Sequence, residues 1–199
     1  MKKTSTLILF ALFGFASAWA QEFKAVSPSG DTLYYTILDK SHHTVGVVTA
    51  SATTKGALVI PETVTYQGIG YSVIAIEIVA FRGFTGITSV NIPNTVTAIG
   101  DGAFAFCGSL TSVVIPHSVT YLGEEVFYHC DHLESVTLSN AITYIQSGTF
   151  AQCGILTVTI PDAVSAIEED AFEGVRHIIY HGSASGAPWG ALTINGEEE

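Results

Sequence analysis

The feature that most constrains this sequence is a spacing of 23 residues that recurs through its middle. Counting from Phe104, this step reaches a phenylalanine in the preceding repeat and in the two that follow, and a final step of 22 residues reaches another: Phe81, Phe127, Phe150 and Phe172. A fixed period in the twenties is typical of stacked repeats, none of which can bury its apolar face alone. The spacing therefore predicts a solenoid in which these phenylalanines lie one above another.

Each repeat also contains a short run that alternates apolar and polar residues, as in LTSVVI (110–115). The alternation predicts a strand in which Leu110, Val113 and Ile115 point into the interior. Ser112 and Val114 are then expected on the outer face. A proline follows this run in three repeats, and because proline cannot donate to a strand ladder, we expect the strand to end there.

Between these strands, segments such as GDGAFAFC (100–107) and GEEVFYHC (123–130) predict about one helical turn each, with small or acidic residues near its start. A helix this short is not stable alone, so we expect it to be held in place by its buried phenylalanine. The predicted fold class is an α/β repeat, a solenoid with parallel strands and short helical turns.

Two irregularities interrupt the spacing. An insertion in the first coil, YQGIGYS (66–72), is predicted to form a hairpin that leaves the coil. The last full repeat is one residue short, and we place the gap between Leu156 and Val158 because the strand there reads LTVTIP rather than LTSVVIP. This alignment predicts that Leu156 takes the interior position of Leu110.

The repeats are predicted to span residues 57–182, and three further segments flank them. Residues 1–20 have the charged start, apolar run and small-residue cleavage site of a signal peptide. Residues 21–56 contain two alternating runs, DTLYYTILD and TVGVVTA, which we interpret as a hairpin within an N-terminal β cap. Residues 183–199 are interpreted as a C-terminal cap and tail in which Trp189 covers the last coil.

The charge of the chain restricts its partners. The sequence has 7 basic and 18 acidic residues, and without Lys2 and Lys3 of the predicted leader 5 basic residues remain, which gives a formal charge of −13. A surface this negative repels phosphate backbones, so nucleic acid is not an expected partner. The apolar run of the leader is short for a membrane span, and no membrane insertion is expected after signal cleavage.

The repeat AFAFCGSLTSVVIPHSVTYLGEEVF (103–127) and its neighbours resemble the BspA-like leucine-rich repeats of bacteria, the TpLRR type. The resemblance covers about residues 57–182 and departs from the pattern at Phe84 and Ser139, where the other repeats have Cys and Pro. It implies a right-handed leucine-rich-repeat solenoid on an exported or surface protein, often used in adhesion or protein–protein contact. Such a match transfers the fold and leaves the ligand open.

Three cysteines occupy the same position of successive repeats: Cys107, Cys130 and Cys153. Stacked coils would bring neighbouring cysteines within reach of a disulfide, but parallel side chains are poorly aimed for one and the count is odd. We expect buried thiols that act as small apolar groups. The alternative is one disulfide and one free thiol.

Clusters that might suggest chemistry have simpler interpretations. The run His129-Cys130-Asp131-His132 resembles a metal site, but the repeat turns Cys130 inward while the histidines lie at variable positions. We therefore predict no metal and no cofactor. The acidic runs at 124–125 and 168–170 precede short turns, where negative charge is favourable for local reasons. No facing carboxylate or nucleophile motif accompanies them, and an enzyme is not predicted.

The outer face of the strands is the candidate binding site. Across the coils it presents mostly small, uncharged side chains: Ser89, Asn91, Ser112, Val114, Glu134, Ser135, Thr137, Thr159 and Ile179. Solenoids use such extended surfaces to bind partners. The predicted function is a non-enzymatic, adhesin-like module that is secreted, periplasmic or on the cell surface and binds a protein or glycan. The alternative is a structural spacer or display domain of a larger surface protein with no ligand of its own.

Overall fold

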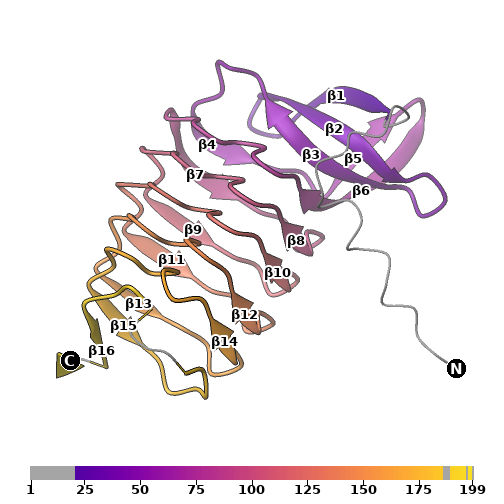
Figure 1. The fold of residues 1–199 in the computed structure, drawn as a ribbon. Helices are drawn as coiled ribbons and strands as arrows, with labels where there is room; N and C mark the ends of the chain where they lie inside the picture. Colours follow the sequence, from indigo (N-terminus) through magenta and orange to yellow (C-terminus); the bar gives the residue numbers. More distant parts are fainter. Residues whose placement is uncertain (1–20, 186–188, 196, 199) are drawn as a thin grey trace, which may run out of the picture.

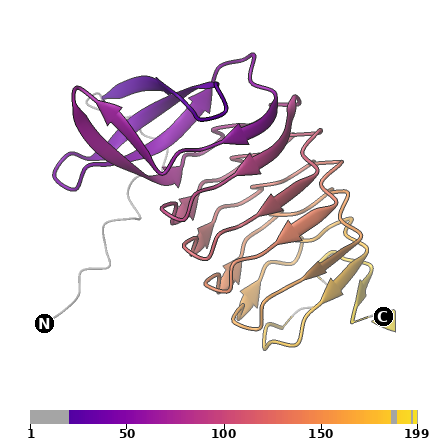
Figure 2. The ribbon, with the colours of Figure 1, turned by 180° about the vertical axis from the view of Figure 1, so that it is seen from behind.

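The computed structural model describes residues 21–185, 189–195 and 197–198, so the predicted signal peptide lies outside the described residues. The chain forms a stack of coils with a twisted sheet at its N-terminal end (Figures 1 and 2). Its regular structure consists of strands, and no helix occurs within the ranges just given. This part of the chain accordingly contains no helix of the length and apolarity that crossing a bilayer requires.

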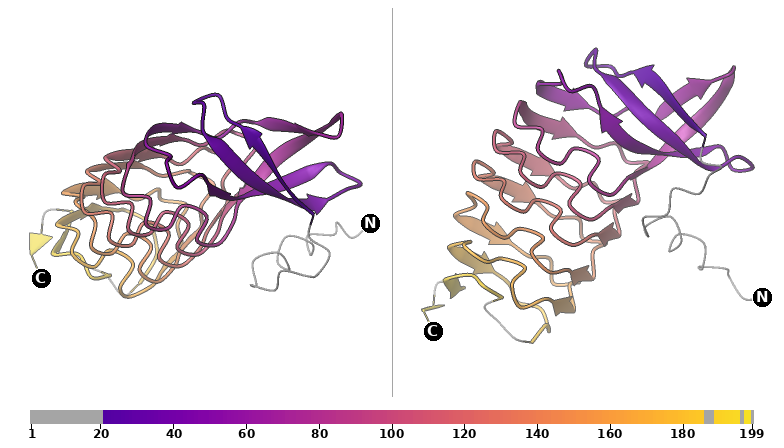
Figure 3. Two further views of the ribbon diagram at one scale, coloured as in Figure 1. Left: turned by 90° about the horizontal axis from the view of Figure 1, so that it is seen from above. Right: turned by 45° about the horizontal axis from the view of Figure 1, so that its top comes forward.

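Six strands build the N-terminal sheet and the start of the stack: β1 (Glu22–Val26), β2 (Thr32–Asp39), β3 (Thr44–Ala50), β4 (Gly56–Val59), β5 (Thr63–Tyr66) and β6 (Ile69–Ile76). β1, β2 and β3 pair in antiparallel order, and β3 then pairs in parallel with β6. Since β6 also pairs with a strand of the next coil, the N-terminal sheet continues directly into the solenoid (Figure 3).

The coils carry two rows of parallel strands. The first row contains β4, β7 (Ile87–Asn91), β9 (Ser112–Val114), β11 (Ser135–Thr137), β13 (Thr157–Thr159), β15 (His177–Ile179) and β16 (Thr193–Ile194), and β17 (Glu197–Glu198) closes it by pairing antiparallel with β16. The second row contains the two-residue strands β8 (Ala98–Ile99), β10 (Tyr121–Leu122), β12 (Tyr144–Ile145) and β14 (Ala166–Ile167). We call the solvent side of the first row the strand face.

The predicted phenylalanine column runs through the interior between the two rows. Its five members are inaccessible to solvent: Phe81, Phe104, Phe127, Phe150 and Phe172. Neighbouring ring centroids are 5.2 to 5.6 Å apart, and the ring planes lie within 12° of parallel. The column confirms that the repeat is a stacking unit, because each ring packs on the equivalent ring of a neighbouring coil.

The strand orientation follows the alternation in the sequence. Leu110, Val113 and Ile115 are buried, and Ser112 and Val114 are exposed on the strand face. The same inward set recurs around β15, where Val175, Ile178 and Tyr180 are buried.

The prediction of short helical turns is wrong. In the segment 101–106, Ala103 and Ala105 donate their amide hydrogens to carbonyls three residues back, whereas Gly102, Phe104 and Phe106 donate to carbonyls of the next coil. Gly102 and Phe106 have positive φ angles of 58° and 61°, which no right-handed helix contains. The segment is therefore a series of turns that donates hydrogen bonds to the next coil, as a strand would. In a helix these amides would instead bond within their own coil.

The gap in the last full repeat lies elsewhere than predicted. Ile155 is buried at 1% exposure and takes the position of Leu110, whereas Leu156 is 61% exposed. The missing residue is therefore next to Gly154, ahead of the strand, and the inward spacing of the strand itself is unchanged. A Cβ atom on Gly154 would lie 2.5 Å from the Asp131 carbonyl oxygen, so only glycine allows this tighter approach.

The N-terminal region contains both predicted hairpins. β2 and β3 form the first, and β5 and β6 form the second with Gln67 and Gly68 at its tip. The second hairpin leaves the coil but packs back on the N-terminal sheet, because Phe23 stacks on Tyr66 at a centroid distance of 4.4 Å. The insertion therefore ties the N-terminal sheet to the first coil.

Trp189 closes the interior at the other end. Its side chain is 2% exposed, its ring packs edge-on against Tyr180, and its carbonyl accepts a hydrogen bond from the Phe172 amide. The indole nitrogen donates to the Ser185 carbonyl. Trp189 thus covers the last coil, as its place in the sequence predicts.

Candidate functional site

The strand face brings most of the predicted site residues together. Ladder pairing aligns Ser89, Ser112 and Ser135 in one row across β7, β9 and β11. A second row aligns Val114 with Thr137. These side chains are exposed apart from Ser89, which is half-buried. Glu134 is exposed just before β11, at the edge of the strand face.

Two predicted residues belong to a separate sheet. Thr159 and Ile179 are paired with each other across β13 and β15. β13 lies beside β11 in the stack (Figure 1), but ladder pairing within the described chain does not join the two strands. The break coincides with the residue missing beside Gly154, so the shorter coil divides the strand face into an N-terminal and a C-terminal half.

A hollow of about 500 Å³ lies on the N-terminal half, at the carboxyl ends of β7 and β9. The predicted residues Asn91 and Val114 line it, and Val114 is 62% exposed. Asn94 and His117 also line it and were missed by sequence reasoning. Both directly follow a proline at the same repeat position, and that shared position is the signal that would have revealed them.

A second hollow of about 390 Å³ lies on the C-terminal half. It is lined by the predicted Ile179 together with His177, His181 and Asn195, which were not among the predicted binding residues. The Asn195 side chain accepts a hydrogen bond from the Tyr180 amide and donates one to its carbonyl, both at 2.9 Å. The side-chain amide of Asn195 thereby bonds to the backbone directly after β15, and these two hydrogen bonds hold Asn195 in the wall of this hollow.

The acidic side chains near the turns bond to neighbouring coils. Asp101 Oδ1 accepts a hydrogen bond from the Glu124 amide at 3.0 Å, and Asp170 accepts from the Gly148 amide and the Ser147 hydroxyl. These carboxylates satisfy donors exposed by the turns, so their positions have a structural reason. They do not face one another across an enclosed site of the kind that paired-acid hydrolysis needs.

The three cysteines are buried free thiols. Each Sγ donates to a phenylalanine carbonyl of the preceding coil: Cys107 to Phe81, Cys130 to Phe104 and Cys153 to Phe127, at 3.0 to 3.1 Å. Burial raises the pKa of Cys107 and of Cys153 to about 12, and raises the pKa of Cys130 as well. The thiols are therefore packing groups, as expected from their repeat position.

The histidines around Cys130 do not converge on it. His129 stacks on Phe106 at a centroid distance of 5.4 Å and contacts Asp131, while the Cys130 thiol points into the interior. His132 contacts the Gly108 carbonyl. A tetrahedral ion needs its ligands on one centre, which these side chains do not provide.

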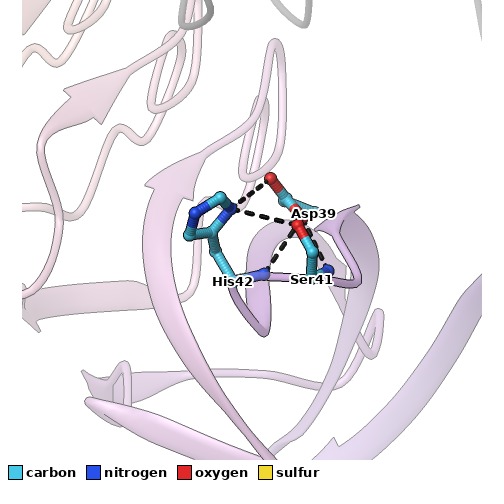
Figure 4. Close-up of polar contacts among 3 residues, drawn as sticks. All are labelled: Asp39, Ser41 and His42. Carbon is cyan, nitrogen blue, oxygen red and sulfur yellow. Dashed lines mark hydrogen bonds and ion pairs between the residues drawn. The ribbon is translucent and has the colours of Figure 1, made fainter.

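Asp39, Ser41 and His42 come together in the loop between β2 and β3 and superficially resemble a catalytic triad (Figure 4). Both Asp39 and Ser41 contact the same ring nitrogen, His42 Nδ1, at 2.7 and 3.2 Å. In a triad the acid and the nucleophile occupy opposite nitrogens of the ring. Hydrogen bonds from the Ser41 hydroxyl and from His42 hold the pKa of Asp39 well below its ordinary value, so this cluster stabilises an exposed turn.

The fold with its two rows of parallel strands, its inward apolar columns and its open strand face is that of a leucine-rich-repeat protein. The model of the BspA type leucine rich repeat region matches residues 61–179 in six copies. The chain therefore belongs to the BspA-type leucine-rich-repeat family. No curated protein sequence matches it.

Solved structures share this fold. The leucine-rich repeat protein of T. pallidum, TpLRR, is 20% identical with a TM-score of 0.56, over 90% of this chain and 85% of that one. The pneumococcal vaccine antigen PcpA is 17% identical with a TM-score of 0.59, over 81% of this chain. This chain spans only 50% of PcpA, and at these identities the likeness establishes the fold alone.

Proposed function

We propose that this protein is a non-enzymatic, exported interaction module that binds a protein or glycan through the strand face. The observation that carries the proposal is the hollow at the ends of β7 and β9, where an apolar floor at Val114 is bordered by the polar side chains of Asn91, Asn94 and His117. Small ligand sites and interface cores combine an apolar surface with a few polar groups in this way.

Three further features support an interaction role outside the cell. The first 20 residues have the pattern of a signal peptide, and a structural relative is described as a vaccine antigen. Val114 and Ile179 are exposed at 62% and 39% on a face made mostly of small, uncharged side chains. Large apolar side chains gathered beside hollows are typical of contact surfaces.

The proposal is tested by screening the mature chain on glycan and extracellular-protein arrays and then measuring affinity for the best ligand. A variant carrying Ser112→Arg, Ser135→Arg and Thr137→Arg should lose at least tenfold in affinity, because three bulky charges cover the centre of the strand face. The matched control carries Thr120→Arg, Thr143→Arg and Ser165→Arg, three exposed positions beside the second row of strands.

Unchanged affinity in the first variant, with both variants folded, would contradict the strand face as the binding surface. A mature chain that binds nothing on either array would favour the alternative function, a structural spacer or display domain. The two results are distinguishable because the first is obtained only when the mature chain binds a ligand whose affinity can be measured, and the second only when it binds none.

A further inference from the structure

A hollow separate from the strand face lies where the N-terminal sheet meets the first coil. It has a volume of about 540 Å³ and is formed by two segments, the loop 52–55 after β3 and the turn 82–86 before β7. The Gly56 amide donates to the Gly86 carbonyl, and Gly86 approaches the Lys55 side chain closely, so the two segments are in contact. The two walls of the hollow are therefore held together by a backbone hydrogen bond and by direct packing.

The charged residues that line this hollow are both basic, in contrast to the acidic character of the chain. Two of the five basic residues outside the leader, Lys55 and Arg82, line it, although the chain carries 18 acidic residues. Both side chains are exposed. Within the described residues, neither of them donates a hydrogen bond to the protein. A positive site on a strongly negative surface selects for anions, because anions are repelled elsewhere.

The position of Arg82 leaves its donors available. The guanidinium carbon lies 4.7 Å from the centroid of the Phe106 ring, a cation–π contact that holds the group without using its N–H donors. Its shortest approach to a carboxylate is 3.9 Å, between Nη1 and Glu125 Oε2, which is too long for a hydrogen bond. Phe106 and Glu125 thus hold the guanidinium on the side of the next coil, while Arg82 also lines the hollow.

A buried hydroxyl in the same hollow lacks a partner. Thr54 is 5% exposed, lines the hollow, and its Oγ1 atom has no hydrogen-bond partner. Buried polar groups without partners are rare in native proteins and often mark a place where a ligand or water belongs. Thr53 and Thr85, both exposed residues, also line the hollow, and the Thr53 hydroxyl bonds to that of Ser51.

From these observations we propose that the hollow binds an oxyanion, a sulfate, carboxylate or phosphate group, carried by a small molecule such as an acidic sugar. Lys55 and Arg82 supply the positive charge, and the threonine hydroxyls supply neutral donors. The volume exceeds that of one tetrahedral anion and lies in the range of small-molecule sites, so the hollow has room for a ligand that carries the anion as a substituent. The site is independent of the strand face and of the function proposed for it.

The test titrates the ¹⁵N-labelled mature chain at constant ionic strength and monitors its amides by NMR. The three titrants are N-acetylglucosamine 6-sulfate, inorganic sulfate and neutral N-acetylglucosamine. The sulfated sugar should shift the amides of 53–56 and 82–86 in a saturable manner, inorganic sulfate more weakly, and the neutral sugar should leave them unchanged. Lys55→Met should weaken binding of the sulfated sugar about tenfold through the loss of one charge-assisted hydrogen bond.

Two further variants keep the test decisive. Thr54→Val should remain folded, because its hydroxyl has no partner to lose, and should weaken binding several-fold. Arg176→Met, which removes a cation from the last coil, should bind as the parent chain does. The proposal is overturned if the sulfated sugar produces no saturable shift, if the neutral sugar binds equally, or if Lys55→Met and Thr54→Val leave the affinity unchanged.

Discussion

Phe104 and Phe106 stand two residues apart and play different roles. Phe104 is fully buried in the column, whereas Phe106 is 38% exposed on the outer turn, where it has a positive φ and stacks on His129. The 23-residue spacing identifies Phe104, because a column position must recur in every coil. It says nothing about Phe106, whose equivalents include Gly83 and Gln152.

Replacing Phe127 by Ala should lower the free energy of unfolding by about 3–5 kcal/mol, since it removes a ring that two neighbouring rings cover and leaves a cavity. Phe106→Ala is the control and should cost about 1 kcal/mol, because only surface stacking is lost. Urea unfolding followed by circular dichroism measures both. Equal losses in the two variants would contradict the column as the main source of stability.

The three thiols should resist modification in the folded protein. Burial and raised pKa values keep them protonated at pH 8, so a thiol reagent should react with none of them in the native state and with all three in denaturant. Fewer than three reactive thiols in non-reducing denaturant would instead indicate a disulfide.

Glu77 should make stability depend on pH. Its carboxylate lies against Gly46 of β3, and burial raises its pKa from 4.5 to about 7. The folded state therefore binds a proton that the unfolded state releases between these values, so stability falls as pH rises from 4.5 to 7 and is lowest above it. The resulting loss in the free energy of unfolding is at most about 3 kcal/mol. It is smaller than this limit because water reaches the partly exposed side chain and screens its charge.

Glu77→Gln tests this dependence, because the amide has a similar shape and does not titrate. The variant should match the parent chain near pH 4 and be more stable at pH 8 in thermal unfolding. A parent chain whose stability is equally high at pH 5 and pH 8 would contradict the buried carboxyl.

At the level of strands and turns, the sequence predicted the orientation of the strands and gave the wrong backbone conformation to the turns between them. Alternation within LTSVVI was sufficient to orient the strand, because a strand has only two faces. The helical turns were wrongly predicted because a segment rich in small and acidic residues fits both a helix start and stacked turns. Backbone angles at Gly102 and Phe106 decide between the two, and sequence pattern does not encode them strongly.

The shortened coil provides a matched pair of glycines. Gly154→Ala should destabilise the protein by about 1–3 kcal/mol, because the new methyl group would meet the Asp131 carbonyl oxygen at 2.5 Å. Gly108 precedes the strand of an ordinary coil, and a methyl group there would meet nothing within 4 Å. Gly108→Ala should therefore be close to neutral. Urea unfolding of both variants compares them directly, and equal effects would contradict the assigned position of the missing residue.

On the scale of the whole molecule, the sequence predicted the stack and its strand face, whereas the hollows required coordinates. The predicted site residues lie in rows because the ladder register repeats with the sequence. Asn94, His117 and Lys55 join the hollows through loops and through contacts between distant segments, which periodicity does not report. The break between β11 and β13 was also missed, since it depends on where the shorter coil absorbs its missing residue.

The stacked column of phenylalanines is the claim on which the fold, the strand face and both proposed sites depend. Nuclear Overhauser contacts between the aromatic rings of the mature chain test it most directly. Each of Phe81, Phe104, Phe127, Phe150 and Phe172 should show contacts to the ring one coil away, in that order, because the centroids of neighbours are 5.2 to 5.6 Å apart. Rings that show no such contacts, or contacts in another order, would contradict the solenoid and remove the surfaces built on it.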